Sequence, residues 1–135
     1  MAYPVTEIDD IGSDDAAALR RVGIRTTDAL LEAAKSPKGR RELAAKIAVD
    51  EKRLLKWANC ADRMRIKGVG DDYSQLIRAA GVDTVRELKH RNAKKLTEAM
   101  RNANAKRKLV NFLPSEKAVA RWIEHAKKLP IKISY

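Results

Sequence analysis

Apolar residues recur along most of the chain at intervals of three and four, which places them on one face of an α-helix. Ala16, Leu19 and Val22 are an example. No segment alternates apolar and polar residues for long enough to form a central strand, so we predict an all-α fold. Only the short segments 3–6 and 131–135 are rich in β-forming residues. They predict either a two-stranded β-clip between the termini or two frayed tails.

This pattern belongs to an internal repeat. Residues 8–12, Ile-Asp-Asp-Ile-Gly, return 58 positions later as residues 66–70, Ile-Lys-Gly-Val-Gly, and the match continues to Leu30 and Leu88. A fixed spacing of this kind indicates one supersecondary unit used twice. We predict two repeats of about four helices each, residues 1–65 and 66–135, that share one core.

Capping residues mark the expected helix starts in both repeats. Thr84 and Glu87 have the spacing of a capping box, and Gly23 is expected to end the first helix in the left-handed conformation. Trp57 and Trp122 each lie seven positions after a cap, on an apolar face. We interpret both as core residues, the alternative being stacking on bases. The expected caps are Ser13, Thr26, Ser36, Asp50, Thr84, Asn92 and Ser115.

Each unit reads as an apolar-Gly loop, a short helix, a Gly-apolar-x-Thr turn and a second helix. This order resembles the helix-hairpin-helix motif. The resemblance implies that two hairpins contact the backbone of a nucleic acid duplex across its minor groove, without reading bases, and that hairpin carbonyls can hold a monovalent cation. The whole chain, from Tyr3 to Tyr135, is also similar to an uncharacterised bacterial family of small tandem helix-hairpin-helix proteins.

Charge separates the two repeats. The chain carries a formal net charge of +11, of which residues 1–65 supply +2 and residues 66–135 supply +9. A cluster of cations of this density favours phosphate binding, and its alternative is a solvated helical face. Glycines in the second loop allow close backbone approach, and the following helix start offers free N–H groups. The predicted contact residues are Lys67, Gly68, Val69, Gly70, Lys89, Arg91, Lys94, Lys95, Arg101, Lys106, Arg107 and Lys108.

The first loop departs from this pattern because Asp10 stands where the second loop has Gly68. Further acids surround it, and like charges repel a phosphate. We therefore predict that the first repeat keeps the fold and has lost or changed the contact. The second loop is also followed by two acids, which stabilise a helix start through the helix dipole. The acids in question are Glu7, Asp9, Asp14 and Asp15 in the first repeat and Asp71 and Asp72 in the second.

Residues for catalysis or metal binding are not grouped in the sequence. The paired carboxylates stand at helix starts, Cys60 is expected to be a buried inert thiol, and His90 and His125 are too few for a zinc site. We therefore expect no enzymatic activity, no metal, no small-molecule substrate and no cofactor beyond the monovalent cation that the resemblance allows. No apolar segment has signal or membrane length, so we expect a cytoplasmic protein that does not contact membranes.

Two function classes follow. The first is a non-catalytic module that binds duplex DNA through its phosphate backbone with little sequence preference, RNA being a further possible ligand. The sequence lacks the interleaved aromatic residues of a single-strand stacking platform, which favours a duplex. The second is a protein-protein interaction adaptor that uses helical surfaces of opposite charge.

Overall fold

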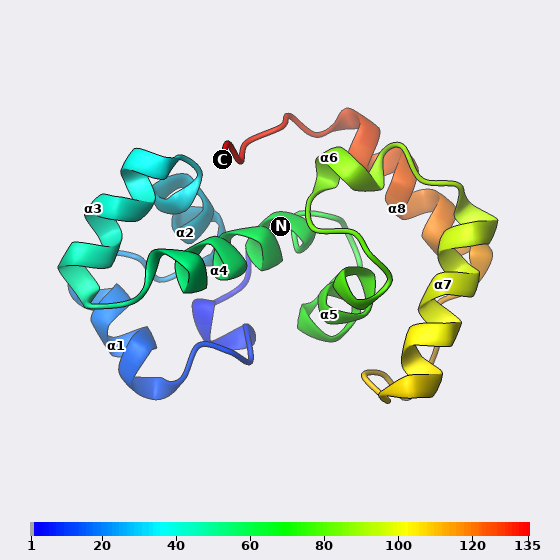
Figure 1. The fold of residues 1–135 in the computed structure, drawn as a ribbon, viewed down its shortest axis with the longest axis horizontal. Coiled ribbons are helices and arrows are strands. Elements are labelled where there is room, and N and C mark those ends of the chain that lie inside the picture. The colour runs from blue at the N-terminus through cyan, green and yellow to red at the C-terminus, as the bar shows by residue number, and fades with distance from the viewer. Residues whose placement is uncertain (1) are drawn as a thin grey trace.

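The chain folds into helices, as predicted. The computed structural model describes residues 2–135, and these contain eight α-helices, one short 3-10 helix and no strand. Helices α1–α4 form one half of the molecule and α5–α8 the other, side by side along its longest axis (Figure 1). The elements are η1 Val5–Glu7, α1 Ser13–Arg21, α2 Thr27–Ala34, α3 Pro37–Ile47, α4 Glu51–Arg63, α5 Asp71–Ala79, α6 Val85–Leu88, α7 Ala93–Lys106 and α8 Glu116–Lys128.

The segments around α1 and α5 share several backbone features. Helices α1 and α5 both have nine residues, and each follows a glycine with negative φ, Gly12 at −76° and Gly70 at −90°. Each is followed by a glycine with positive φ, Gly23 at 84° and Gly81 at 100°. Only glycine adopts such angles without steric cost, so these two glycines permit the reversals between α1 and α2 and between α5 and α6.

Most of the predicted caps are confirmed. Five of these side chains accept a backbone hydrogen bond of 2.7 to 3.1 Å from the helix that they begin: Thr26, Ser36, Asp50, Asn92 and Ser115. Ser13 was wrongly predicted, because it is the first residue of α1 and Gly12 is the N-cap. The capping box is also wrong in part. The Thr84 hydroxyl bonds to the Glu87 carboxylate but accepts no backbone N–H of α6. The N–H of Val85, the first residue of α6, donates to Asp62 of α4, at 2.9 Å.

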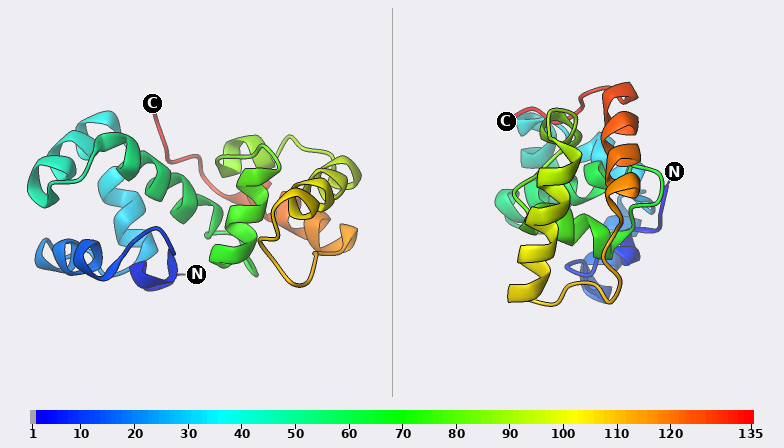
Figure 2. Two further views of the ribbon diagram at one scale, coloured as in Figure 1. Left: turned by 60° about the horizontal axis from the view of Figure 1, so that its bottom comes forward. Right: turned by 90° about the vertical axis from the view of Figure 1, so that its right-hand side faces the viewer.

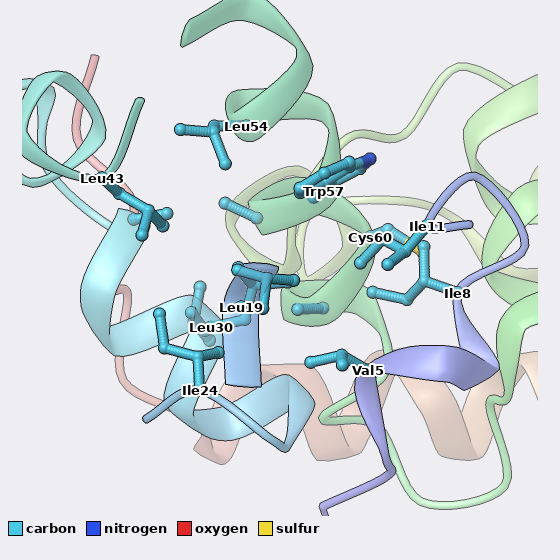
Figure 3. Packing of buried hydrophobic residues seen from close by; sticks show 14 of the residues in the cluster. Val5, Ile8, Ile11, Leu19, Ile24, Leu30, Leu43, Leu54, Trp57 and Cys60 are labelled. Atoms are coloured by element: carbon cyan, nitrogen blue, oxygen red, sulfur yellow. The ribbon is translucent and has the colours of Figure 1, made fainter. Parts of the chain in front are cut away.

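The predicted single core is wrong, because the buried apolar residues form two clusters. The first cluster is built from η1 and α1–α4 together with Ile133, and the second from residues 66–126. Figure 3 shows the first, in which Leu19, Leu30 and Leu54 gather around α4. Both tryptophans are buried, with 0% of Trp57 and 6% of Trp122 exposed. Their interpretation as core residues is therefore confirmed.

Polar groups occupy the junction between the clusters, and this explains the division. Arg63 of α4 is 1% exposed and donates to the carbonyl and hydroxyl of Ser74, at 2.9 and 3.0 Å, and to the carbonyl of Asp83, at 2.8 Å. Asp62 accepts from Arg65 as well as from α6. Buried polar groups must be hydrogen-bonded, so they interrupt an apolar core. Burial also lowers the pKa of Arg63, which remains a cation.

The predicted clip between the termini is also wrong, because the two ends attach to opposite ends of α2. Near the N-terminus the carbonyl of Tyr3 accepts from Thr27, at 2.8 Å. At the other end the N–H of Ser134 donates to the carbonyl of Lys35, at 2.8 Å, and its own carbonyl accepts from Arg40. The C-terminal segment therefore crosses back from α8 to the first half (Figures 1 and 2). Helix ends leave unpaired backbone groups, and each terminus satisfies some of them.

Replacing Ile133 with alanine is expected to lower the free energy of unfolding by about 2–3 kcal/mol, because its side chain is 3% exposed within the first cluster. Ile131→Ala is the matched control, since Ile131 is 43% exposed and should change stability by less than about 1 kcal/mol. Guanidinium denaturation followed by circular dichroism measures both. Equal effects of the two variants would show that Ile133 does not anchor the segment.

Candidate nucleic-acid interface

The second loop, residues 66–70, presents its middle to solvent and buries its apolar positions. Lys67 and Gly68 are exposed and Gly70 is half-buried, whereas Val69 is 0% exposed and packs in the second cluster. Val69 is therefore an anchor whose side chain does not reach solvent. The N–H of Lys67 donates to Nδ1 of His125, at 3.1 Å. This bond ties the loop to α8.

The two glycines of the second loop differ in backbone conformation. Gly68 has φ +89°, and a Cβ there would lie 3.7 Å from Nε1 of Trp122. Gly70 has φ −90° and nothing within 4 Å of such a Cβ. A positive φ therefore requires glycine at Gly68 but not at Gly70.

Gly68→Ala is expected to cost about 1–2 kcal/mol of stability, because an L-residue is strained at positive φ. Gly70→Ala is expected to cost less than about 1 kcal/mol, since its backbone is extended and the space is open. Chemical denaturation of both variants measures the difference. Similar losses at the two positions would contradict the difference in backbone conformation.

The carboxylate of Asp10 attaches the first loop, residues 8–12, to α4. Oδ2 of Asp10 accepts from Nε1 of Trp57, at 2.7 Å. Arg53 lies 3.5 Å from Oδ2 and Lys56 lies 3.8 Å from Oδ1 of the same carboxylate. Arg53 also pairs with Asp15, at 2.8 Å, and lies over the Trp57 ring. The acids of this loop are thus partly neutralised from α4.

A groove of about 1130 Å³ lies between the two loops. It is lined by Gly68 and Gly70 from the second loop, by Asp9 and Asp10 from the first, and by the segment after α7 that includes Phe112. Four cations and five carboxylates line it: Lys56, Arg78, Arg107, Lys108, Glu7, Asp9, Asp10, Asp71 and Asp72. Because the charges nearly cancel, the groove itself is not strongly positive.

The predicted basic residues are spread over the second half. Arg107 and Lys108 join the second loop in the groove, whereas Arg91 lies beside Gly81, beyond the other end of α5. Lys89 and Arg91 are half-buried. Four more are exposed on α7: Lys94, Lys95, Arg101 and Lys106. The structure therefore brings only part of the predicted set together with the loop.

None of the nine predicted cations forms an ion pair within residues 2–135. By contrast, the pairs that do form involve cations such as Arg53, Arg65 and Lys132. Cations without a carboxylate partner retain their attraction for phosphate, and seven of these nine are exposed while Lys89 and Arg91 are half-buried. They are Lys67, Lys89, Arg91, Lys94, Lys95, Arg101, Lys106, Arg107 and Lys108.

Sequence reasoning missed two groups at this interface. Lys56 and Arg78 line the groove together with the second loop, although they come from α4 and α5. Phe112 is 81% exposed, and its carbonyl accepts from the Tyr73 hydroxyl, at 3.0 Å. No sequence signal places these residues beside the loop, because the contacts depend on how the helices pack.

The remaining chemistry is sparse. Cys60 is 2% exposed and burial raises the pKa of its thiol, so the reactive thiolate is disfavoured. Within residues 2–135, no three His, Cys, Asp or Glu side chains are placed to hold a metal ion together. None of the helices in that range has the length and hydrophobicity needed to span a bilayer.

A family model described as domain of unknown function (DUF4332) matches residues 9–129. The chain belongs to this family. The match takes in the second loop and all eight α-helices of the described residues, and it confirms the expectation of an uncharacterised family. Comparison of the DUF4332 chain with curated proteins and with solved structures gives no match. Membership of the family assigns no activity.

Proposed function

We propose that this chain is a tandem helix-hairpin-helix module that binds duplex DNA through its phosphate backbone, without catalysis and with little sequence preference. The observation that carries the proposal is the set of nine cations in the second half that find no carboxylate partner within residues 2–135. Such cations gain free energy by displacing the counterions of a polyanion.

The matched turns support the helix-hairpin-helix part of the proposal. In both halves an apolar residue of the loop donates back across it, from Ile11 to Ile8, at 2.9 Å, and from Val69 to Ile66, at 3.1 Å. A nine-residue helix and a glycine with positive φ follow each loop. The loop and the start of the following helix present backbone N–H groups, which suit a phosphate.

The phosphates are expected to follow the outer face of the second half and not the floor of the groove. The groove carries five carboxylates against four cations. By contrast, Lys94, Lys95 and Arg101 project from α7 with only Glu98 among them as a charged neighbour. A duplex backbone on this face therefore meets mainly positive charge, and the second loop provides its closest backbone approach.

Competition among ligands tests this proposal. A labelled random-sequence duplex is bound to the full chain at low salt and then displaced with unlabelled duplex, single-stranded DNA or structured RNA. We expect the duplex DNA to compete best, because Phe112 is the one exposed aromatic side chain in the lining of the groove beside the loop, whereas a single-strand platform stacks successive bases on several aromatics. Stronger competition by RNA would move the function to RNA, and absence of duplex binding would exclude the proposal.

Exposed apolar residues favour a second candidate, a protein-protein interaction adaptor. Phe112 is 81% exposed and Leu113 is 43% exposed, next to the groove. Neighbouring exposed apolar side chains often mark a protein contact. A Phe112→Ser, Leu113→Ser variant separates the candidates: it should leave the salt-dependent binding of duplex DNA unchanged and should abolish binding to a protein partner.

A further inference from the structure

A single side chain forms a hydrogen bond with the second loop within residues 2–135, and it is a histidine. The N–H of Lys67 donates to Nδ1 of His125 on α8, at 3.1 Å. Nδ1 accepts this bond only while the imidazole is neutral and carries its proton on Nε2, because both ring nitrogens of an imidazolium are donors. The attachment of the second loop to α8 therefore depends on the protonation state of His125.

The first loop is attached to α4 by groups of a different kind. Arg53 donates to the backbone carbonyl of Asp10, at 3.0 Å, and the indole of Trp57 donates to its carboxylate, at 2.7 Å. Guanidinium and indole groups keep their protons over the range in which histidine ordinarily titrates, about pH 5 to 8. Of the two loops, the second is thus the one whose attachment depends on a histidine, and the first serves as an internal reference.

The surroundings of His125 offer a protonated ring another partner. His125 is half-buried and lines a hollow of about 250 Å³ together with Asp28 and Glu32 of α2. Hydrogen bonds from Lys132 and Lys35 lower the pKa of Glu32, which keeps this carboxylate ionised. Asp28 is exposed and forms no ion pair within residues 2–135. An imidazolium is attracted to such carboxylates.

Cations also surround the ring, but two of them already have partners. Arg65 donates to Asp62, at 2.9 Å, and Lys132 donates to Glu32, at 3.2 Å. Asp28 is therefore the carboxylate of the hollow that has no cation of its own within residues 2–135. The charged groups around His125 are Asp28 and Glu32 on α2, Arg65 and Lys67 before α5, Lys132 in the C-terminal segment, and Arg121, Glu124 and Lys128 on α8 itself.

We infer that His125 is a pH-sensitive latch for the second loop. The neutral ring accepts from Lys67 and holds the loop against α8. When the ring takes a proton from solvent, the Nδ1–H and the N–H of Lys67 are two donors facing each other, so their hydrogen bond is lost. The ring then turns toward Asp28 in the first half of the molecule, and the loop is released.

The inference rests on the proposed function only for its consequence. The second loop provides the closest backbone approach to the duplex in that proposal, so a released loop has to be ordered again when it binds. The lost bond should weaken binding by roughly 3- to 10-fold, the net value of one hydrogen bond.

The latch itself is tested without any ligand, by ¹H–¹⁵N spectra of the full chain between about pH 5 and 8. We expect the Lys67 amide resonance to follow the same titration curve as the ring protons of His125. Protection of this amide from hydrogen exchange, corrected for the intrinsic pH dependence, should fall by roughly 3- to 10-fold on acidification. The indole N–H resonance of Trp57 reports on the first loop and should stay unchanged.

Two variants of His125 separate its titration from other effects of pH. Gln supplies an acceptor that does not titrate, so His125→Gln should keep the Lys67 amide protected throughout. His125→Leu removes the acceptor and should leave the amide unprotected at every pH. His90→Gln is the matched control, since His90 is exposed and its ring forms no hydrogen bond within residues 2–135. A Lys67 amide that does not respond to pH in the wild-type protein, or responds equally in His125→Gln, would overturn the latch.

An Asp28→Asn variant tests the partner assigned to the protonated ring. Loss of this carboxylate disfavours the imidazolium, so the midpoint of the Lys67 transition should move to lower pH. Asp14→Asn is the control, because Asp14 is also exposed but lies on α1 and does not line the hollow. Equal midpoints in the two variants would show that Asp28 is not the partner.

A duplex titration separates the latch from the proposed function. At about pH 5.5 the wild-type protein should bind a random-sequence duplex roughly 3- to 10-fold more weakly than His125→Gln, and at about pH 7.5 the two should bind equally. A Lys67 transition without duplex binding at either pH would retain the latch and exclude the DNA module. Duplex binding with a Lys67 amide that does not respond to pH would overturn the latch and retain the module.

Discussion

Replacing Arg63 with methionine is expected to lower the free energy of unfolding by about 2–4 kcal/mol. Arg63 is almost fully buried and donates to Ser74 and Asp83, which belong to the other half of the molecule. Methionine fills similar space but leaves these acceptors without their donor, and each unsatisfied buried acceptor costs about 1–3 kcal/mol. Relief from burying a cation offsets part of the loss.

Guanidinium denaturation measures this effect, with Arg41→Met as the control. Arg41 lies on α3, is exposed and forms no ion pair within residues 2–135, so its replacement should change stability by less than about 0.5 kcal/mol. If Arg63→Met remains within that same range, the polar junction between the two clusters does not stabilise the fold.

Neutralising Lys67, Lys94 and Lys95 with glutamine is expected to have the largest effect on DNA binding. Each lysine that contacts a phosphate contributes about 0.9 to the slope of log K against log salt, so the slope should become less steep by about 2–3. Affinity at low salt should fall by roughly 10- to 100-fold. All three side chains are exposed, and stability should change by less than about 1 kcal/mol.

A matched control removes three charges from the first half. Lys38, Arg41 and Lys46 lie on α3 and are also exposed. Their replacement with glutamine lowers the net charge equally but should leave the salt slope nearly unchanged. If both triple variants lower the slope to the same extent, binding depends on net charge alone and the second half is not the interface.

The helices were largely predictable because their signals are local. Apolar spacing and capping residues such as Thr26 and Asn92 act within a few residues of each helix start, and the structure confirms them. The turn glycines Gly23 and Gly81 were predictable for the same reason, because a chain that reverses directly after a helix needs a left-handed residue there.

The errors came from contacts between residues distant in sequence. Asp62 accepts from the first N–H of α6, 23 residues away, whereas Thr84, the predicted cap, accepts no backbone hydrogen bond. Arg63 divides the core because its acceptors lie in the other half. Asp10 was interpreted as a repulsive charge, and its bond to Trp57, 47 residues away, had no signature in the sequence. Tertiary packing decides such contacts, and one sequence does not show them.

The most direct measurement of backbone binding is the affinity for random-sequence duplexes at several salt concentrations. If about five phosphates are neutralised, log K should fall with log salt at a slope of about −4 to −5. Duplexes of unrelated sequence should give the same affinity and the same slope, because backbone contacts carry no sequence information. No measurable binding at low salt, or a strong preference for one sequence, would contradict binding through the phosphate backbone.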